Sequence, residues 1–341
     1  MGASTHIALP IEEISQIGDA RRRAAALADK LAFDAVAAGR VALVVTELAT
    51  NLVRHAKGGQ LLLAVRGEGT AEAAVEVLSI DRGPGIASMA ACLEDGFSTG
   101  GTAGTGLGAI RRQADEFDAY ADASGTLLVA RVRAARATPS GPPAVAGPVI
   151  SHGGISLCAP GEMVCGDQWA FVGAGAQAAL IVADGLGHGP IAAEAALAAV
   201  AVFEAEAVGQ SPSRVLELAH AALRSTRGAA VSVARMDGNT VSYAGAGNVA
   251  GRLVSALDSR SLVAHHGTLG LQVRKLQDFH YDWTEHALLI LHSDGLATRW
   301  DLQKVPGLLQ RDPSLIAAFL IRDHCRGKDD VAVVVVRRRV G

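Results

Sequence analysis

Two kinds of hydrophobic pattern alternate along the first part of the chain. Residues 11–57 are rich in alanine, and their apolar positions recur with the three- and four-residue spacing of helices. Residues 60–69 and 73–81 instead have the apolar runs that predict strands. After glycine-rich loops, a helix is predicted near 107–117 and a last strand at 125–133. This mixture predicts a first domain of the α+β class.

The periodicity stops between residues 135 and 149, where the sequence ARATPSGPPAVAGPV gathers proline, glycine and alanine. Such a composition is typical of a connection between domains. We therefore predict a first domain over residues 1–134, a linker over 135–149 and a second domain over 150–341.

The second domain has the stronger strand signal, and helical stretches separate its strands. Together these patterns predict a layered, β-rich core, so the whole chain is expected to be α+β. The predicted strands cover residues 178–184, 229–237, 240–247, 287–295 and 331–339, and the predicted helices lie near 190–207, 211–226 and 313–324.

Composition narrows the classes of function. The chain has 341 residues, of which 50% are hydrophobic, and a formal net charge of −3 with its basic residues dispersed, so no nucleic-acid partner is expected. No leader pattern precedes the first domain and no stretch looks long enough to span a membrane, which favours a cytoplasmic protein. The four cysteines lack the spacing of a zinc site and are expected to be reduced thiols.

Aspartates stand at the ends of several apolar runs in the second domain. A single Asp-Gly pair is usually a turn, but several in one domain are harder to explain that way. Carboxylates that meet at strand ends repel one another, and Mg²⁺ or Mn²⁺ relieves that repulsion with oxygen coordination. Two such ions can activate a water for attack on phosphorus. The set comprises Asp167, Asp184, Asp294, Asp329 and Asp330.

These residues carry a family resemblance. The ordered segments CGDQWAF, VADGLGHG, YAGAGN, HSDG and KDDVAVVVV resemble the SpoIIE/RsbX branch of the PPM metal-dependent serine/threonine protein phosphatases. The resemblance covers roughly residues 150–340 and implies an α-β-β-α sandwich with two Mn²⁺ or Mg²⁺ ions at one end. It also implies that Asp184 bridges both ions, that the Gly185 carbonyl binds one, and that Asp294 and Asp329 hold the other. Asp167 would act through metal-bound water.

The second domain departs from the family at two places. Asp330 stands where related sequences often have asparagine, so it ranks below Asp329 as a ligand. Leu186 occupies the position of a histidine proposed as general acid in many eukaryotic members. His188 is an alternative acid, although a loop histidine without a catalytic role is the competing interpretation.

Two further segments allow a structural and a functional interpretation. Arg224 and Arg227 could contact a phosphoserine, because guanidinium groups bind phosphate in a bidentate manner, or could simply be surface residues. Gly245, Gly247 and Asn248 predict a tight connection between strands.

The first domain contains a polar stripe and two glycine motifs. Glu47, Asn51 and His55 follow at four-residue spacing and share one helix face. Asp81 ends a strand just before the glycines of DRGPG, and STGGTAGTGLG stands ahead of a helix. Backbone N–H groups at a helix N-terminus make a phosphate cradle. No GK[ST] follows, which excludes a Walker motif.

The set resembles the GHKL (Bergerat) ATP-binding fold, with closest likeness to RsbT/RsbW-type anti-sigma-factor serine kinases, over residues 10–133. The resemblance implies an α/β sandwich in which Asn51 holds Mg²⁺ on the phosphates of ATP. Asp81 would bind the adenine amino group with Thr126, and Glu47 would accept the proton of a substrate serine. The glycine motifs supply Gly83 and Gly85 beside the base and Gly104, Gly106, Leu107 and Gly108 over the phosphates.

Together the motifs predict a bifunctional regulator. The kinase and the phosphatase would act on one serine or threonine of a STAS-type anti-sigma-factor antagonist, and fusion would raise their effective concentration at that partner. Two alternatives stay open: ATP binding that only gates the phosphatase, and a non-catalytic, nucleotide-dependent complex with a sigma factor or another partner. A homodimer is a candidate assembly, and no membrane partner is expected.

Overall fold

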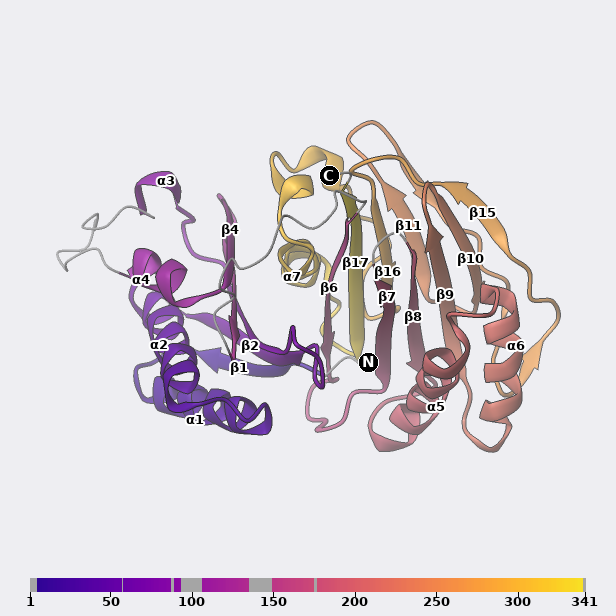
Figure 1. The fold of residues 1–341 in the computed structure, drawn as a ribbon, viewed down its shortest axis with the longest axis horizontal. Coiled ribbons are helices and arrows are strands. Elements are labelled where there is room, and N and C mark those ends of the chain that lie inside the picture. The colour runs from indigo at the N-terminus through magenta and orange to yellow at the C-terminus, as the bar shows by residue number, and fades with distance from the viewer. Residues whose placement is uncertain are drawn as a thin grey trace. The chain divides into compact units, whose positions relative to one another are not determined.

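The computed structural model describes residues 5–56, 58–86, 89–92, 106–134, 149–174 and 177–339. The chain divides into two compact units, His6–Ser140 and a second unit made chiefly of Gly141–Gly341. Each is described by itself (Figure 1). Residues 135–148 of the predicted linker lie outside the described residues, so the bounds of that linker stay a prediction.

The first unit is an antiparallel sheet with helices packed on one face. The strands lie in the order β1-β2-β3-β5-β4, and every neighbouring pair is antiparallel. Apolar side chains of the long helices and of the sheet form one core. The elements are β1 (Ile7–Ile11), α1 (Ser15–Lys30), α2 (Ala35–Asn51), η1 (Leu52–Ala56), β2 (Gly59–Arg66), β3 (Ala74–Asp81), α3 (Met89–Cys92), α4 (Gly106–Gln113), β4 (Glu116–Asp122) and β5 (Gly125–Arg133).

Helix α2 carries Glu47 and Asn51 of the predicted polar stripe, whereas His55 lies in the π-helical turn η1 that follows. Asp34 caps α2, since the carboxylate accepts a hydrogen bond from the Ala37 N–H at 2.7 Å. Together with η1 it forms a stretch, Ala35–Ala56, that is long and apolar enough to cross a membrane by length and composition, contrary to the sequence-based expectation. Packing accounts for this composition, because the apolar face is buried in the core through Val41, Val44, Val45 and Leu48.

The second unit is a sandwich of two five-stranded sheets with helices outside. One sheet has the order β15-β10-β9-β8-β7 and the other β12-β11-β16-β17-β6. Helices α5 and α6 pack on the first sheet, and α7 packs on β6 and β17 of the second (Figure 1). This arrangement confirms the expected α-β-β-α sandwich and the α+β class.

The strands of the second unit are β6 (Val149–Leu157), β7 (Asp167–Ala174), β8 (Gln177–Gly185), β9 (Ala229–Asp237), β10 (Thr240–Ala246), β11 (Ala250–Val254), β12 (Ser259–Ser261), β13 (Gly267–Thr268), β14 (Gln272–Val273), β15 (Phe279–Asp282), β16 (Leu288–His292) and β17 (Val331–Arg339). The helices are α5 (Pro190–Glu206), α6 (Pro212–Ala222), α7 (Pro313–His324) and the short η2 (Leu223–Ser225), η3 (Leu302–Lys304) and η4 (Leu308–Gln310).

Strand β8 is buried on both faces, which explains why its sequence is a continuous apolar run. Leu180 and Val182 face the core between the two sheets. Ile181 and Ala183 face the opposite way, into the core formed with α5 and α6. The apolar run ends at Asp184, so this carboxylate lies at the edge of the two hydrophobic cores that cover the faces of β8.

Most predicted elements are confirmed within a few residues, and the predicted helix at 107–117 is the clearest error. The helix ends at Gln113, and β4 begins at Glu116, so Glu116 and Phe117 lie in a strand and not in the predicted helix. The structure also adds β1, a short strand at the sheet edge that contains Pro10, a residue that sheets tolerate at their edges.

Candidate functional site

Two neighbouring strands bring Asp167 and Asp184 side by side. Asp167 begins β7, Asp184 lies near the end of β8, and the antiparallel register makes them direct partners. Asp167 is 2% exposed. Its Oδ2 atom has no hydrogen-bond partner among the described residues. A buried carboxylate oxygen without a donor is costly, so the pair is suited to a cation.

Asp294 and Asp329 come to the same edge from the other sheet. Asp294 follows β16 and Asp329 precedes β17, and these two strands pair. Burial raises the pKa of Asp184 to about 7, and the charges of Asp294 and Asp329 add to the rise. Burial also raises the pKa of Asp167 well above its ordinary range, with the charge of Asp184 as the next cause. The four carboxylates therefore meet and repel one another.

This donor set fits hard divalent cations such as Mg²⁺ and Mn²⁺, which take oxygen ligands. A cation would supply the counter-charge that the buried carboxylates lack. The neighbouring Gly185 has no room for a side chain, because a Cβ atom there would stand 2.0 Å from the Ala192 carbonyl oxygen on α5. Glycine thus lets the helix approach the strand end closely.

Asp330 has a different environment from Asp329. Its Oδ1 accepts a hydrogen bond from the Ala159 N–H at 2.7 Å, and its Oδ2 accepts one from the Gly166 N–H at 2.9 Å. The Asp330 N–H in turn donates to Asp329 Oδ1 at 2.9 Å. Both oxygens of Asp330 thus accept hydrogen bonds from backbone N–H groups.

Sequence reasoning missed two polar residues of this edge. Asn248 Nδ2 donates a 2.6 Å hydrogen bond to Asp294 Oδ2. Ser293 is fully buried, accepts a hydrogen bond from the Ala332 N–H at 2.9 Å, and has a side-chain hydrogen bond with Asp167 that partly offsets the rise in its pKa. The signal for Ser293 was its place between β16 and Asp294. Asn248 was interpreted as a turn residue, and it does lie between β10 and β11.

The loop after Asp184 contacts two other segments. His188 Nδ1 lies 2.6 Å from Glu162 Oε1, and the His188 side chain is 63% exposed. The Leu186 N–H donates to the Gly228 carbonyl at 3.0 Å. Next to that contact, the Arg227 guanidinium lies 3.4 Å from where a Cβ atom of Gly187 would stand. Among the two arginines proposed for phosphate recognition, this position favours Arg227.

In the first unit, Asp81 organises the turn after β3. Its Oδ1 accepts hydrogen bonds from the Gly83 N–H at 2.7 Å and from the Thr126 N–H at 3.1 Å. A Cβ atom on Gly85 would stand 2.1 Å from the Asp122 carbonyl oxygen, and the φ of Gly85 is +73°. Glycine is therefore required at position 85. These contacts join the predicted adenine-binding residues into one structural element.

The start of α4 lies against the polar stripe of α2. A Cβ atom on Gly106 would stand 3.5 Å from both Asn51 Oδ1 and Glu47 Oε2. The structure thus brings Glu47, Asn51 and the N-terminus of α4, with Leu107 and Gly108 in its first turn, to one place. Gly104 lies outside the described residues, so its predicted role is not addressed by this geometry.

Comparison with known proteins matches one family model to each of the two units. Residues 12–132 match the model of the histidine kinase-like ATPase domain, and residues 174–339 match that of stage II sporulation protein E (SpoIIE). The serine/threonine-protein kinase RsbT of Bacillus subtilis (strain 168) is 36% identical over 101 residues, which cover 29% of this chain and 73% of RsbT. The chain belongs to the histidine kinase-like ATPase family and carries a SpoIIE domain.

Similar solved structures cover about half of the chain. One, described as "The bacterial stressosome: a modular system that has been adapted to control secondary messenger signaling", is 30% identical, with a TM-score of 0.50, and covers 55% of this chain and 99% of its own. RsbX in complex with magnesium is 23% identical, with a TM-score of 0.49, and covers 56% of this chain and 96% of its own. The chain thus combines a histidine kinase-like ATPase domain with a SpoIIE domain.

Proposed function

We propose that this chain is a bifunctional cytoplasmic regulator that removes phosphate from a phosphoserine or phosphothreonine protein and carries an ATP-dependent serine kinase module. The observation that carries the phosphatase is the meeting of four carboxylates from two sheets, with the pKa of Asp184 raised to about 7 and no donor to Asp167 Oδ2 among the described residues. Carboxylates in such surroundings are typical of a functional site.

In the proposed site, Asp184, Asp294, Asp329 and the Gly185 carbonyl would hold two Mn²⁺ or Mg²⁺ ions, and Asp167 would contribute to the site through water. The bound ions supply Lewis acidity and a water of lowered pKa. The protein's own part is orientation. Asn248 fixes Asp294 through its 2.6 Å hydrogen bond, as groups behind metal ligands commonly do.

The phosphate of the substrate needs a positive contact on the protein side. We assign that contact to Arg227, which lies beside the loop that follows Asp184. His188 is paired with Glu162 and exposed, so its proposed part is to hold the loop rather than to protonate a leaving group.

In the first unit, the proposed ligand is ATP with Mg²⁺. Both backbone N–H groups that reach Asp81 donate to its Oδ1 atom, and no described residue donates to Oδ2. Oδ2 can therefore accept a hydrogen bond from the adenine amino group, and Thr126 would help to bind the same group. Asn51 would hold Mg²⁺ and Glu47 would accept the proton of the substrate hydroxyl. Gly83 and Gly85 shape the base side, and Gly104, Gly106, Leu107 and Gly108 the phosphate side.

The proposed protein substrate is a STAS-type anti-sigma-factor antagonist, on which the two domains act in opposite directions. RsbT is described as a serine/threonine-protein kinase, and the description of one similar structure names the bacterial stressosome, which supports a partner of this signalling class. The alternative is that ATP only gates the phosphatase or a complex with a sigma factor. A homodimer is the proposed assembly to test first.

The test incubates the full chain with a STAS protein, phosphorylated and unphosphorylated, with Mn²⁺ and with or without ATP, followed by intact mass. We expect loss of one phosphoryl group from the phosphorylated form, abolished in Asp184→Ala. Gain of one phosphoryl group with ATP, abolished in Glu47→Ala, is expected for the kinase. A phosphatase with no kinase turnover would favour the gating alternative, and no mass change would reject this substrate.

A further inference from the structure

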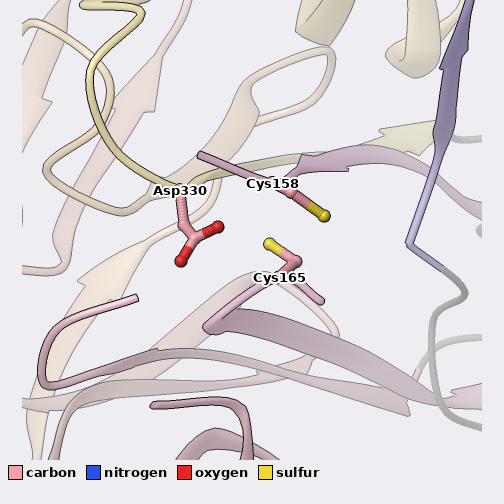
Figure 2. Close-up of side chains that lie close together, drawn as sticks. All are labelled: Cys158, Cys165 and Asp330. Atoms are coloured by element: carbon pink, nitrogen blue, oxygen red, sulfur yellow. The ribbon is translucent and has the colours of Figure 1, made fainter. Parts of the chain in front are cut away.

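Two cysteines mark the ends of a loop beside the carboxylate edge of the second unit. Cys158 directly follows β6 and Cys165 stands shortly before β7, with CAPGEMVC as the sequence of the loop. Their sulfur atoms and a carboxylate oxygen of Asp330 all lie within 4.8 Å of one another. Figure 2 shows the sulfur atoms of the two Cys side chains close to one another, with the Asp330 carboxylate beside them. All four cysteines of the chain are free thiols in this structure.

Asp330 holds the two ends of this loop together. Its carboxylate accepts from the Ala159 N–H at 2.7 Å and from the Gly166 N–H at 2.9 Å. Each of these N–H groups belongs to the residue directly after one of the cysteines. One buried side chain therefore fixes the backbone at both cysteines, which keeps the two thiols adjacent without a disulfide between them.

The two thiols differ in access. Cys165 is buried, lies 3.2 Å from Ser156 Oγ, and donates to the Leu157 carbonyl at 3.3 Å. Cys158 is only partly buried. An oxidant therefore reaches Cys158 first, and Cys165 is placed to resolve the product. Burial raises the pKa of both thiols, so the reaction at neutral pH is expected to be slower than for an exposed cysteine.

We propose that Cys158 and Cys165 are an oxidation site, which a peroxide converts into a disulfide that closes the loop. The Cys158 sulfur attacks one peroxide oxygen, the O–O bond breaks, and a sulfenic acid forms with release of water. The Cys165 sulfur then displaces the hydroxyl of the sulfenic acid as a second water. Two thiols and one hydrogen peroxide thus give one disulfide and two waters.

The disulfide alters the edge where the metal ligands stand. The sulfurs must close to about 2.05 Å. This movement shifts the Ala159 and Gly166 peptides that hold Asp330, and Asp330 donates its own N–H to Asp329. This contact from the loop through Asp330 to Asp329 rests on the proposed function for its consequence. Oxidation should raise the Mn²⁺ concentration needed for half-maximal phosphatase activity on the order of 10-fold, and a thiol reductant should reverse the rise.

The test of the site itself does not depend on phosphatase activity. The full chain is treated with hydrogen peroxide, quenched, alkylated and digested, and the peptides are identified by mass. We expect a disulfide between Cys158 and Cys165, seen as a peptide mass lower by two hydrogen atoms. Treatment with a reductant should restore the two free thiols. Cys158→Ser should abolish the cross-link, whereas the matched control Cys325→Ser should keep it.

Three results would overturn the proposal. They are alkylation of both Cys158 and Cys165 after peroxide treatment, a cross-link to Cys92 or Cys325, and conversion of Cys158 to a sulfinic acid without any cross-link. These results are measured on the thiols themselves, so they test the oxidation site whether or not the second unit proves to be a phosphatase. An unchanged Mn²⁺ requirement in the cross-linked chain would overturn the link to the metal edge.

Discussion

Replacing Asp184 by asparagine is expected to stabilise the second unit when no metal is present. The carboxyl group has an ordinary pKa of 3.8, which burial and the charges of Asp294 and Asp329 raise to about 7 in the folded chain. Each tenfold change in proton affinity corresponds to about 1.4 kcal/mol, so the charged form of Asp184 costs the metal-free fold up to about 4 kcal/mol. Asparagine removes that charge.

The sign of the effect fixes its dependence on pH. A carboxyl group whose pKa is higher in the folded chain binds its proton more tightly there, so the cost is absent below pH 3.8, grows as the pH rises, and is complete above about pH 7. Asp184→Asn should therefore stabilise the chain much more at pH 8 than at pH 5. The 4 kcal/mol is an upper limit because solvent and side-chain movements reduce the cost.

Calorimetry in the presence of a chelator measures this effect, and the transition of the second unit must be followed separately because two domains need not unfold together. The matched control is Asp282→Asn on β15, an exposed aspartate that should change little at either pH. Adding Mn²⁺ should raise the unfolding temperature of the wild type more than that of Asp184→Asn. A variant that unfolds at a lower temperature than the wild type at pH 8 without metal would refute the reasoning.

Three further changes test other contacts. Asn248→Ala removes the donor to Asp294 and should raise the Mn²⁺ requirement of the phosphatase about 10–100-fold, measured by titrating the metal; an unchanged requirement would contradict the orienting role. Asp81→Asn should remove the stabilisation of the first unit by ATP in thermal melts, and a full ATP shift in this variant would exclude Asp81 from the nucleotide site. Arg40→Ala breaks a buried 2.6 Å ion pair with Asp115 and should cost about 3–5 kcal/mol in denaturant unfolding, whereas exposed Arg22→Ala should cost less than about 1 kcal/mol.

The strands of the second unit were predictable because strands buried on both faces have continuous apolar sequences. Strands β8 and β17 are continuous apolar runs, and each is a central strand with neighbours on both sides. The acids that mark the ends of these runs could likewise be found, because a carboxylate beside a long apolar segment is unusual. The start of β4 was predicted as helix because Phe117 continues the three- and four-residue spacing of Leu107, Ile110 and Ala114.

The contacts behind the ligands could not be predicted from spacing. Asn248 and Asp294 are far apart in the sequence and meet only because β11 pairs with β16, so each appears locally as a turn residue. The same holds for Asp330, whose carboxylate reaches across to Ala159 and Gly166. Local pattern specifies which side chains stand at strand ends, whereas strand pairing decides which of them touch.

The measurement that tests the central claim most directly is the rate at which the full chain hydrolyses a phosphate monoester in the presence of Mn²⁺. The wild type should turn over with Mn²⁺ and stop when a chelator is added. Asp294→Ala should abolish turnover, and Glu47→Ala, in the other unit, should leave it unchanged. Equal turnover by Asp294→Ala and the wild type, or none by the wild type with Mn²⁺, would contradict a metal-dependent phosphatase at this carboxylate edge.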